Sequence, residues 1–298
     1  MKPTLAEVSE KLVKLGLWQE LASVNFAIRP RGTVFPYFCT TVKAEMPGIA
    51  ARVMLIEGWQ TFHDFLRGRV DRAFGVATGP IELQHFEFLA LDSGAVHTFR
   101  YDTGYAPRPT TEKEAPLLTK LLWEVYGLAM RLESDLQLPM RYAAEQAVFS
   151  RQEQSNGKWI DAPLPIVQPQ PYGEKVTFPK ALATKAADLP FRKDEIVEID
   201  FRLLPGVSTR EARPRLVYEL SVVDVAAKKD LVRERTSFNP EVGLKGMWET
   251  VPVRLMHDFV DLGKVPGQIH CFSPRVFRFL RPLCMELPIK LSLHDRKA

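Results

Sequence analysis

Three arginines at regular spacing near the C-terminal end of the sequence suggest a site that binds anions. Arg275, Arg278 and Arg281 follow Ser273-Pro274, in which serine can cap a helix and proline suits the first helical position. Residues three apart share one face of a helix, so these guanidinium groups and the helix N-terminus could bind phosphate or an RNA backbone. The alternative is the solvent-facing side of an amphipathic helix, which we favour.

Two His-Asp pairs, His63-Asp64 and His257-Asp258, contain the residue types of a general base and the carboxylate that orients it. Both pairs fall on the polar face of a predicted helix, where adjacent side chains point about 100° apart. Neither aspartate is therefore well placed to orient its own histidine. We interpret all four side chains as solvated surface residues.

The cysteines do not indicate a metal centre or a disulfide framework. Cys39, Cys271 and Cys284 are scattered, without a CxxC pair or a histidine at ligand spacing. The motifs of serine hydrolases, P-loop proteins, dinucleotide-binding folds and zincins are also absent. We therefore predict no metal and no cofactor, and interpret the cysteines as buried thiols in a reducing cytoplasm.

Composition is that of an ordinary globular chain. Apolar residues make up 46% and charged residues 26% of the 298 residues, and the net charge is +4. No window approaches the roughly 18 apolar residues of a membrane helix, and the N-terminus leads into an amphipathic helix instead of a signal core. We expect a cytoplasmic protein without a membrane contact. Its partner is unknown; a protein partner or weak attraction to polyanions fits this charge.

The pattern of elements predicts an α+β fold with antiparallel or mixed sheets in two domains. Residues 1–150 read as an α+β domain with capping boxes at Thr4-Glu7 and Thr111-Glu114, ending in a long helix over 112–138. The interval 151–190 contains six prolines after residue 162, which predicts a connection with an edge strand and no helix. Residues 191–298 predict the order βββαβαβ.

One stretch of the first domain resembles a protease motif. Residues 90–99, which include Asp92, resemble the catalytic-aspartate motif of retroviral-type aspartic proteases, and Asp102-Thr103-Gly104 follows. The resemblance implies two carboxylates that share a proton. The sequence, however, runs on into a long helix, and two aspartates in one loop are not the two halves of such a site. We interpret the stretch as a polar loop before a helix.

The C-terminal domain is similar in element order to ribonuclease-H-like nucleases. That resemblance implies carboxylates on the first strand, at the end of the fourth strand and on the following helix, where they hold two magnesium ions. Asp200 could be the first, and Asp224 is the second carboxylate we select. The fourth strand, however, ends in Cys271-Phe272-Ser273, which has no carboxylate. The alternation around Asp200 also predicts a strand with one wet face.

The whole chain resembles a group of uncharacterised two-domain bacterial proteins. The resembling stretches include Phe99-Arg100, Gly104-Tyr105-Ala106-Pro107, Arg213-Pro214-Arg215-Leu216 and Pro266-Gly267-Gln268-Ile269. This resemblance implies no activity and no catalytic residue. Our leading hypothesis is a non-catalytic binding or scaffold protein. The alternatives are an active or degenerate ribonuclease-H-like hydrolase, and an RNA or polyanion binder that uses the arginine-rich helix.

Overall fold

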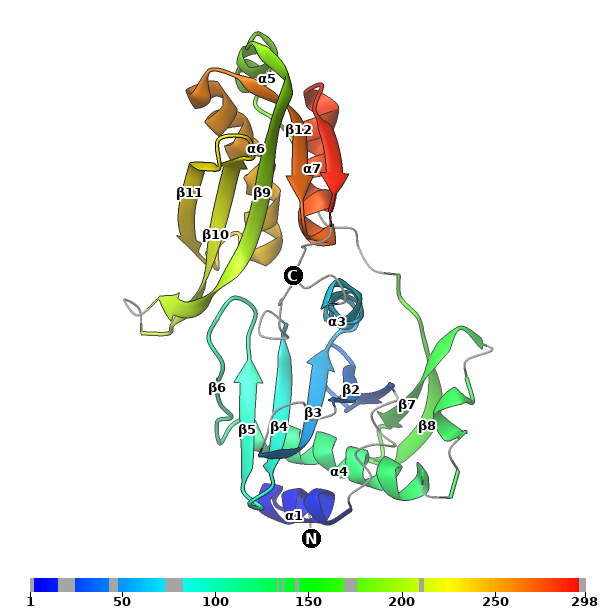
Figure 1. Ribbon diagram of the computed structural model, residues 1–298. Coiled ribbons are helices and arrows are strands. Elements are labelled where there is room, and N and C mark those ends of the chain that lie inside the picture. The colour runs from blue at the N-terminus through cyan, green and yellow to red at the C-terminus, as the bar shows by residue number, and fades with distance from the viewer. Residues whose placement is uncertain are drawn as a thin grey trace. The chain divides into compact units, whose positions relative to one another are not determined.

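The computed structural model describes residues 3–15, 25–42, 48–72, 83–132, 134–135, 137–142, 145–168, 176–208 and 212–294. The chain forms two compact units (Figure 1). Unit 1 comprises Met1–Phe65, Leu83–Asp102 and Pro107–Pro169, and unit 2 comprises Leu66–Glu82, Thr103–Ala106 and Gln170–Ala298. Helices accompany mixed sheets in both units, which confirms the predicted α+β class. The domain boundaries drawn from the sequence, at 150 and 190, stay predictions.

Unit 1 contains an eight-stranded sheet. Its strands are β1 (Phe26–Arg29), β2 (Tyr37–Val42), β3 (Ile49–Glu57), β4 (His85–Leu91), β5 (Val96–Tyr101), β6 (Arg108–Pro109), β7 (Ala147–Glu153) and β8 (Trp159–Pro165). The strand order is β6-β5-β4-β3-β2-β1-β7-β8. Strands β1 and β7 are parallel, and the other neighbouring pairs are antiparallel.

Helices α1 (Leu5–Leu15) and α4 (Ala115–Leu132) pack on one face of this sheet. Both predicted capping boxes are present, because Thr4 N donates to Glu7 Oε2 at 2.7 Å and Thr111 N donates to Glu114 Oε2 at 2.9 Å. Helix α4 is shorter than the predicted 112–138. The carboxylate of Asp135 accepts from the backbone N of Gln137, and this local turn competes with a further helical turn.

The other face of the unit 1 sheet carries a second set of aromatic side chains. The first residues of α3 (Trp59–Arg72) pack there, and the rings of Phe38 and Phe62 stack with centroids 4.3 Å apart. Phe38, Met54 and Ile56 are fully buried on this face. Strands β2 and β3 are therefore covered on both faces.

The interval 151–190 is only partly the connection that its prolines predict. Strand β8 is an edge strand, as expected, since Pro163 and Pro165 cannot donate to a further neighbour. The expectation of no helix is wrong, because α5 (Lys180–Ala187) lies inside the interval. Its sequence holds no proline: Pro179 stands at the N-cap and Pro190 follows the helix, two positions that proline tolerates.

Unit 2 contains a five-stranded mixed sheet in the order β11-β10-β9-β12-β13. Its elements are β9 (Phe191–Ser208), β10 (Arg215–Asp224), β11 (Lys229–Ser237), α6 (Gly243–Leu262), β12 (Val265–Cys271), α7 (Pro274–Glu286) and β13 (Lys290–Leu293). This sequence of elements confirms the predicted order βββαβαβ. Helix α6 begins at Gly243 instead of near 250, and Pro252 lies inside it.

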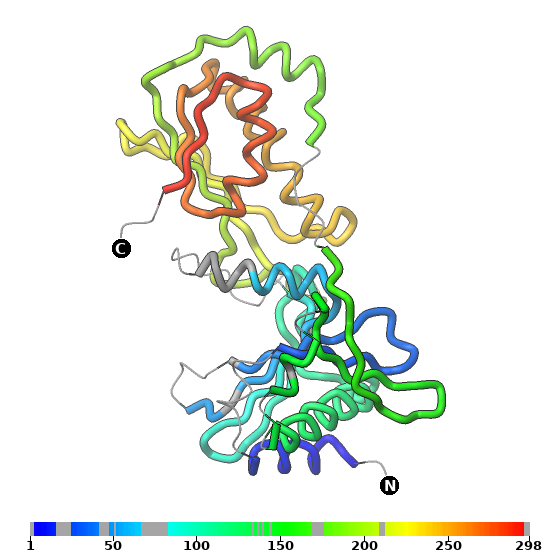
Figure 2. Tube along the Cα trace, turned by 90° about the vertical axis from the view of Figure 1, so that its right-hand side faces the viewer, coloured from blue at the N-terminus to red at the C-terminus, as the bar shows by residue number. Residues whose placement is uncertain are grey.

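Helices α6 and α7 cover one face of the unit 2 sheet, and Figure 2 shows both on the same side of the strands. Val197, Ile199 and Phe201 of β9 point into this core, while Glu198, Asp200 and Arg202 alternate with them. The predicted strand with one wet face is therefore confirmed. No helix in the described part of the chain is long and apolar enough to cross a membrane.

Candidate functional site

The two carboxylates selected from the sequence do not come together. In the pairing of β9 with β10, Asp200 lies opposite Ser221 and Asp224 lies opposite Val197. Directly paired residues share a face of a sheet, so Asp224 belongs to the face of Val197, whereas Asp200 belongs to the other face. Asp224 also has a local role, because its Oδ1 accepts from Ala227 N at 2.9 Å in the turn before β11.

The wet face of the unit 2 sheet carries one buried acid between arginines. Glu219 of β10 is 2% exposed, and its carboxylate pairs with Arg202 of β9 at 2.9 Å and with Arg235 of β11 at 3.2 Å. Arg202 is the main cause of the lowered pKa of Glu219. Both arginines are exposed to solvent, whereas the acid between them is buried. The centre of this face therefore presents guanidinium groups to solvent.

The three arginines of α7 do not act as one set. The guanidinium of Arg275 lies 4.8 Å from the ring centroid of Trp248, inside unit 2. Arg278 and Arg281 are exposed. The opposite side of the helix is buried through Val276, Phe279, Leu280 and Leu283, as an amphipathic helix predicts.

Two members of the His-Asp pairs are not the solvated residues that we expected. His63 stacks on Trp59 and its Nε2 lies 2.7 Å from the carbonyl oxygen of Val167. Asp258 is 7% exposed and pairs with Arg254 Nε at 3.2 Å, and burial raises the pKa of its carboxyl. His257 is exposed. The 100° between adjacent helical positions separates His257 from Asp258, so the first is exposed and the second is buried.

Asp92 and Asp102 do not share a loop, which corrects the interpretation from the sequence. Asp92 lies in the turn between β4 and β5, and Asp102 follows β5, so the strand separates them. Asp102 Oδ1 accepts from Arg100 Nε at 2.9 Å, which gives it a structural partner.

Arg100 and Arg108 join three acids into an ionic network in unit 1. Arg100 is 9% exposed and donates to Glu57 at 2.7 Å as well as to Asp102. Arg108 donates through both terminal nitrogens to Glu114, each at 2.7 Å. These hydrogen bonds, with those of Thr111, lower the pKa of Glu114 to about 2. The network ties β3, β5 and β6 to the start of α4.

A buried polar cluster that was not predicted from the sequence lies on the opposite face of the same sheet. His85 and Glu87 of β4 are 0% and 1% exposed. His85 Nδ1 donates to the carbonyl oxygen of Leu83 at 2.8 Å, and its ring stacks on Tyr101. Burial lowers the pKa of His85 to about 3, while Glu87 pairs with Arg52. The sequence His-Phe-Glu-Phe shows the strand period but no sign that both faces are covered.

The cysteines are free thiols, as predicted. Cys39 and Cys271 are buried, and burial raises the pKa of Cys271 and of Cys284 to about 12. Over the described ranges, no three histidine, cysteine, aspartate or glutamate side chains gather as metal ligands. The polar clusters are thus built from ion pairs.

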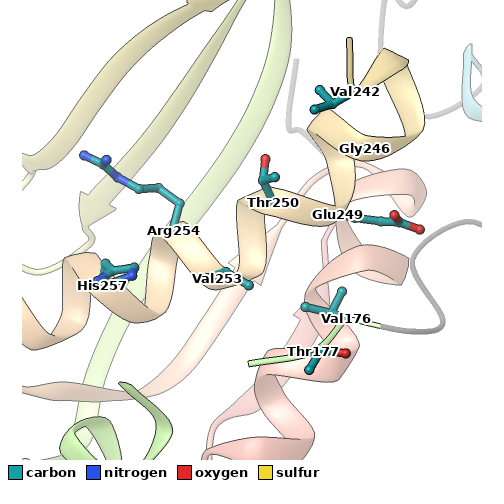
Figure 3. Close-up of a pocket in the computed structure, with 9 residues that line it drawn as sticks. All are labelled: Val176, Thr177, Val242, Gly246, Glu249, Thr250, Val253, Arg254 and His257. Atoms are coloured by element: carbon teal, nitrogen blue, oxygen red, sulfur yellow. The ribbon is translucent and has the colours of Figure 1, made fainter. Parts of the chain in front are cut away.

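A hollow in unit 2 of about 530 Å³ lies beside α6 (Figure 3). Val242, Val253 and Val176 give it an apolar side, and Arg254 extends away from Val176. The charge at its rim is already compensated, because Arg254 pairs with Asp258 and with Glu234 at 3.3 Å. Its chemistry is therefore that of a shallow apolar groove.

A larger hollow of about 910 Å³ lies in unit 1, and we call it the α1–α4 hollow. The start of α1, the turn after β1, the first turns of α4 and the β7–β8 hairpin surround it. Its apolar walls are Pro3, Leu5, Pro30, Ala115, Pro116 and Leu117, and two tryptophans, Trp123 and Trp159, complete them. The volume is within the range of small-molecule sites, about 300–1,000 Å³.

The polar groups of the α1–α4 hollow are fixed by contacts with the protein. Lys120 Nζ donates to Glu153 Oε2 at 2.5 Å and lies 5.7 Å from the ring centroid of Trp159. Glu153 Oε2 also accepts from the backbone N of Arg31 at 2.8 Å. The hydroxyl of Thr119 donates to the carbonyl oxygen of Ala115. The hollow therefore presents rigid, largely apolar walls and a pre-formed charged corner.

Comparison with known proteins finds one similarity, which lies within unit 2. The model of a domain of unknown function, DUF6930, matches residues 183–297. No curated protein and no solved structure matches the chain. The match fits the expected resemblance to proteins without an assigned activity. The resemblance to ribonuclease-H-like modules and the bacterial origin stay predictions.

Proposed function

We propose that this chain is a binding protein that holds an amphipathic small molecule in the α1–α4 hollow. The observation that carries the proposal is the pair of tryptophans, Trp123 and Trp159, on the walls of a concave space of about 910 Å³. Tryptophan combines a large apolar face with few rotatable bonds, so it contributes contact area at a low entropic cost. The function of the chain is otherwise unknown.

The fixed polar corner also supports ligand binding. Lys120, Glu153 and Arg31 hold one another across α4, the β7–β8 hairpin and the turn after β1. A site whose polar groups are ordered before the ligand arrives loses less entropy on binding. We further propose a cytoplasmic location, which the three free thiols support.

A fluorescent probe tests the proposal. N-phenyl-1-naphthylamine is neutral, aromatic and apolar, and its emission rises when it leaves water. We expect it to bind the full chain with a micromolar dissociation constant and to quench tryptophan emission. In Ala115→Phe the new ring fills the hollow from the start of α4, so binding should fall at least 10-fold.

The control variant is Met285→Ala, which removes an exposed side chain of unit 2 that is 84% exposed. It should bind the probe like the unaltered chain. Trp159→Leu provides a second test, because it keeps an apolar wall but removes the aromatic face. Unchanged binding in Ala115→Phe and Trp159→Leu, with both proteins folded by circular dichroism, would contradict the proposal.

Polyanion binding through α7 is a second candidate function. It is supported by the exposure of Arg278 and Arg281 at successive turns of one helix. Binding of a single-stranded RNA should then weaken steeply with salt, and a doubly reversed variant, Arg278→Glu with Arg281→Glu, should bind at least 10-fold less. Salt-independent binding, or equal binding by that variant, would reject this candidate.

A further inference from the structure

The corner of the α1–α4 hollow at Arg31 indicates what kind of ligand fits, and this step rests on the proposed function. Arg31 lies in the turn after β1 and is held at two points. Its backbone N donates to Glu153 Oε2 at 2.8 Å, and its Nη1 donates to the carbonyl oxygen of Ser155 at 2.7 Å. The guanidinium is thus fixed to the β7–β8 hairpin by a neutral acceptor, and no described acid forms an ion pair with it.

The second cation of the hollow is neutralised. Lys120 forms an ion pair with Glu153 Oε2, and this oxygen also accepts a hydrogen bond from the backbone N of Arg31. Among the described residues, Arg31 forms no ion pair of its own. Two acids line the hollow. Glu153 is paired with Lys120, and Glu112 is exposed to solvent.

The start of α4 lies on the same side of the hollow. Ala115, Pro116 and Leu117 form the first turn of an 18-residue helix and line the hollow. The N-terminal end of a helix carries a partial positive charge, which favours an anion nearby. Glu114 caps the helix but directs its carboxylate to Arg108 and Thr111. A fixed guanidinium and a helix start therefore face a space with tryptophan walls.

We infer that the α1–α4 hollow takes a flat apolar molecule that carries one anionic group, with the anion paired to Arg31. A carboxylate, a sulfonate or a phosphate each has the acceptor geometry that a guanidinium binds through two parallel hydrogen bonds. The apolar body lies against Trp123 and Trp159, and the anion remains at the exposed rim, where only part of its hydration is lost. A cation in this corner would meet the unpaired charge of Arg31.

Two dyes with the same ring system separate this inference from the proposed function. 8-Anilinonaphthalene-1-sulfonate carries a sulfonate, and N-phenyl-1-naphthylamine lacks it. We expect the full chain to bind the sulfonate dye about 10-fold more tightly than the neutral dye at low salt. Arg31→Gln should abolish this preference by weakening only the sulfonate dye. Arg31→Lys should retain part of it, since lysine keeps the charge without the planar fork.

Matched variants identify the source of any effect. Arg29→Gln removes an exposed arginine two residues away that does not line the hollow, and it should leave both dyes unchanged. Glu112→Gln removes the exposed acid and should tighten the sulfonate dye by a small factor, about 2-fold. Thermal unfolding of each variant shows whether the fold is intact, because an exposed side chain such as Arg31 contributes little to stability.

The outcomes are distinct. If neither dye binds, the proposed function itself fails. If both dyes bind equally and Arg31→Gln changes neither, the hollow binds apolar molecules and the assignment of an anionic ligand is overturned. If the sulfonate dye is preferred but Arg29→Gln weakens it as much as Arg31→Gln, the preference comes from overall charge and the role of Arg31 is also overturned.

Discussion

The two sheets place the same kinds of charged residue in opposite environments. In unit 1, the ion pair of Arg100 with Glu57 is shielded on both sides, since Arg100 is 9% exposed and Glu57 18%. In unit 2, the wet face buries only the acid, since Glu219 is 2% exposed while Arg202 and Arg235 are 47% and 70% exposed. Ion pairs of similar length can therefore differ in how much they contribute to stability, because one is shielded from solvent and the other is screened by it.

The largest expected effect is the loss of a buried partner. Arg100→Met leaves the carboxylates of Glu57 and Asp102 without their main cation, so unfolding in urea should show a loss of about 3–5 kcal/mol. Arg202→Met is the matched change on the wet sheet, and Glu219 keeps Arg235. It should cost less than about 1 kcal/mol. Equal losses in the two variants would remove the contrast between the sheets.

The next effect depends on pH and comes from His85. Its pKa is lowered from 6.5 to about 3 by burial, so the unfolded chain binds a proton between these values and the folded chain does not. Stability should therefore be full above pH 6.5 and decline as the pH falls, by about 3 kcal/mol at pH 4.

His85→Gln lacks this proton and should show a flatter decline between pH 6.5 and pH 4. His257→Gln, at an exposed position, is the control and should keep the original slope. Urea unfolding at a series of pH values measures both. If His85→Gln retains the slope of the unaltered chain, His85 is not the residue that titrates on unfolding.

The smallest effect concerns the acid of the wet face. Glu219→Gln removes the charge that Arg202 and Arg235 share, and it should cost about 1 kcal/mol at neutral pH. Because the pKa of Glu219 is lowered, its contribution is present above the ordinary pKa of glutamate and is lost as the pH falls. Added salt should shrink the difference between the two proteins, and a salt-independent difference would argue against an electrostatic origin.

Local sequence was a good guide wherever a single segment decided the outcome. The helix start at Ser273-Pro274, the capping boxes at Thr4 and Thr111 and the order βββαβαβ are all present. Each depends on contacts within a few residues or on one period of apolar positions. The exposed side of α7 follows from the same period.

Features that depend on distant contacts were not predicted. The burial of His85 and Asp258, and the separation of Asp200 from Asp224, require knowledge of which strands pair and in which register. The α1–α4 hollow is a stronger example, because Trp123, Arg31 and Glu153 come from three different elements. No spacing in the sequence relates them.

The sequence by itself determined the class of fold, the positions of most helices and strands, and the amphipathic pattern of each. Only the tertiary structure decided which charges are buried, which acids meet arginines and where a hollow remains. The physical reason is the distance along the chain over which each kind of interaction acts. Helix caps and hydrophobic periods act over one or two turns, whereas burial and ion pairing are set by packing between segments that lie far apart along the chain.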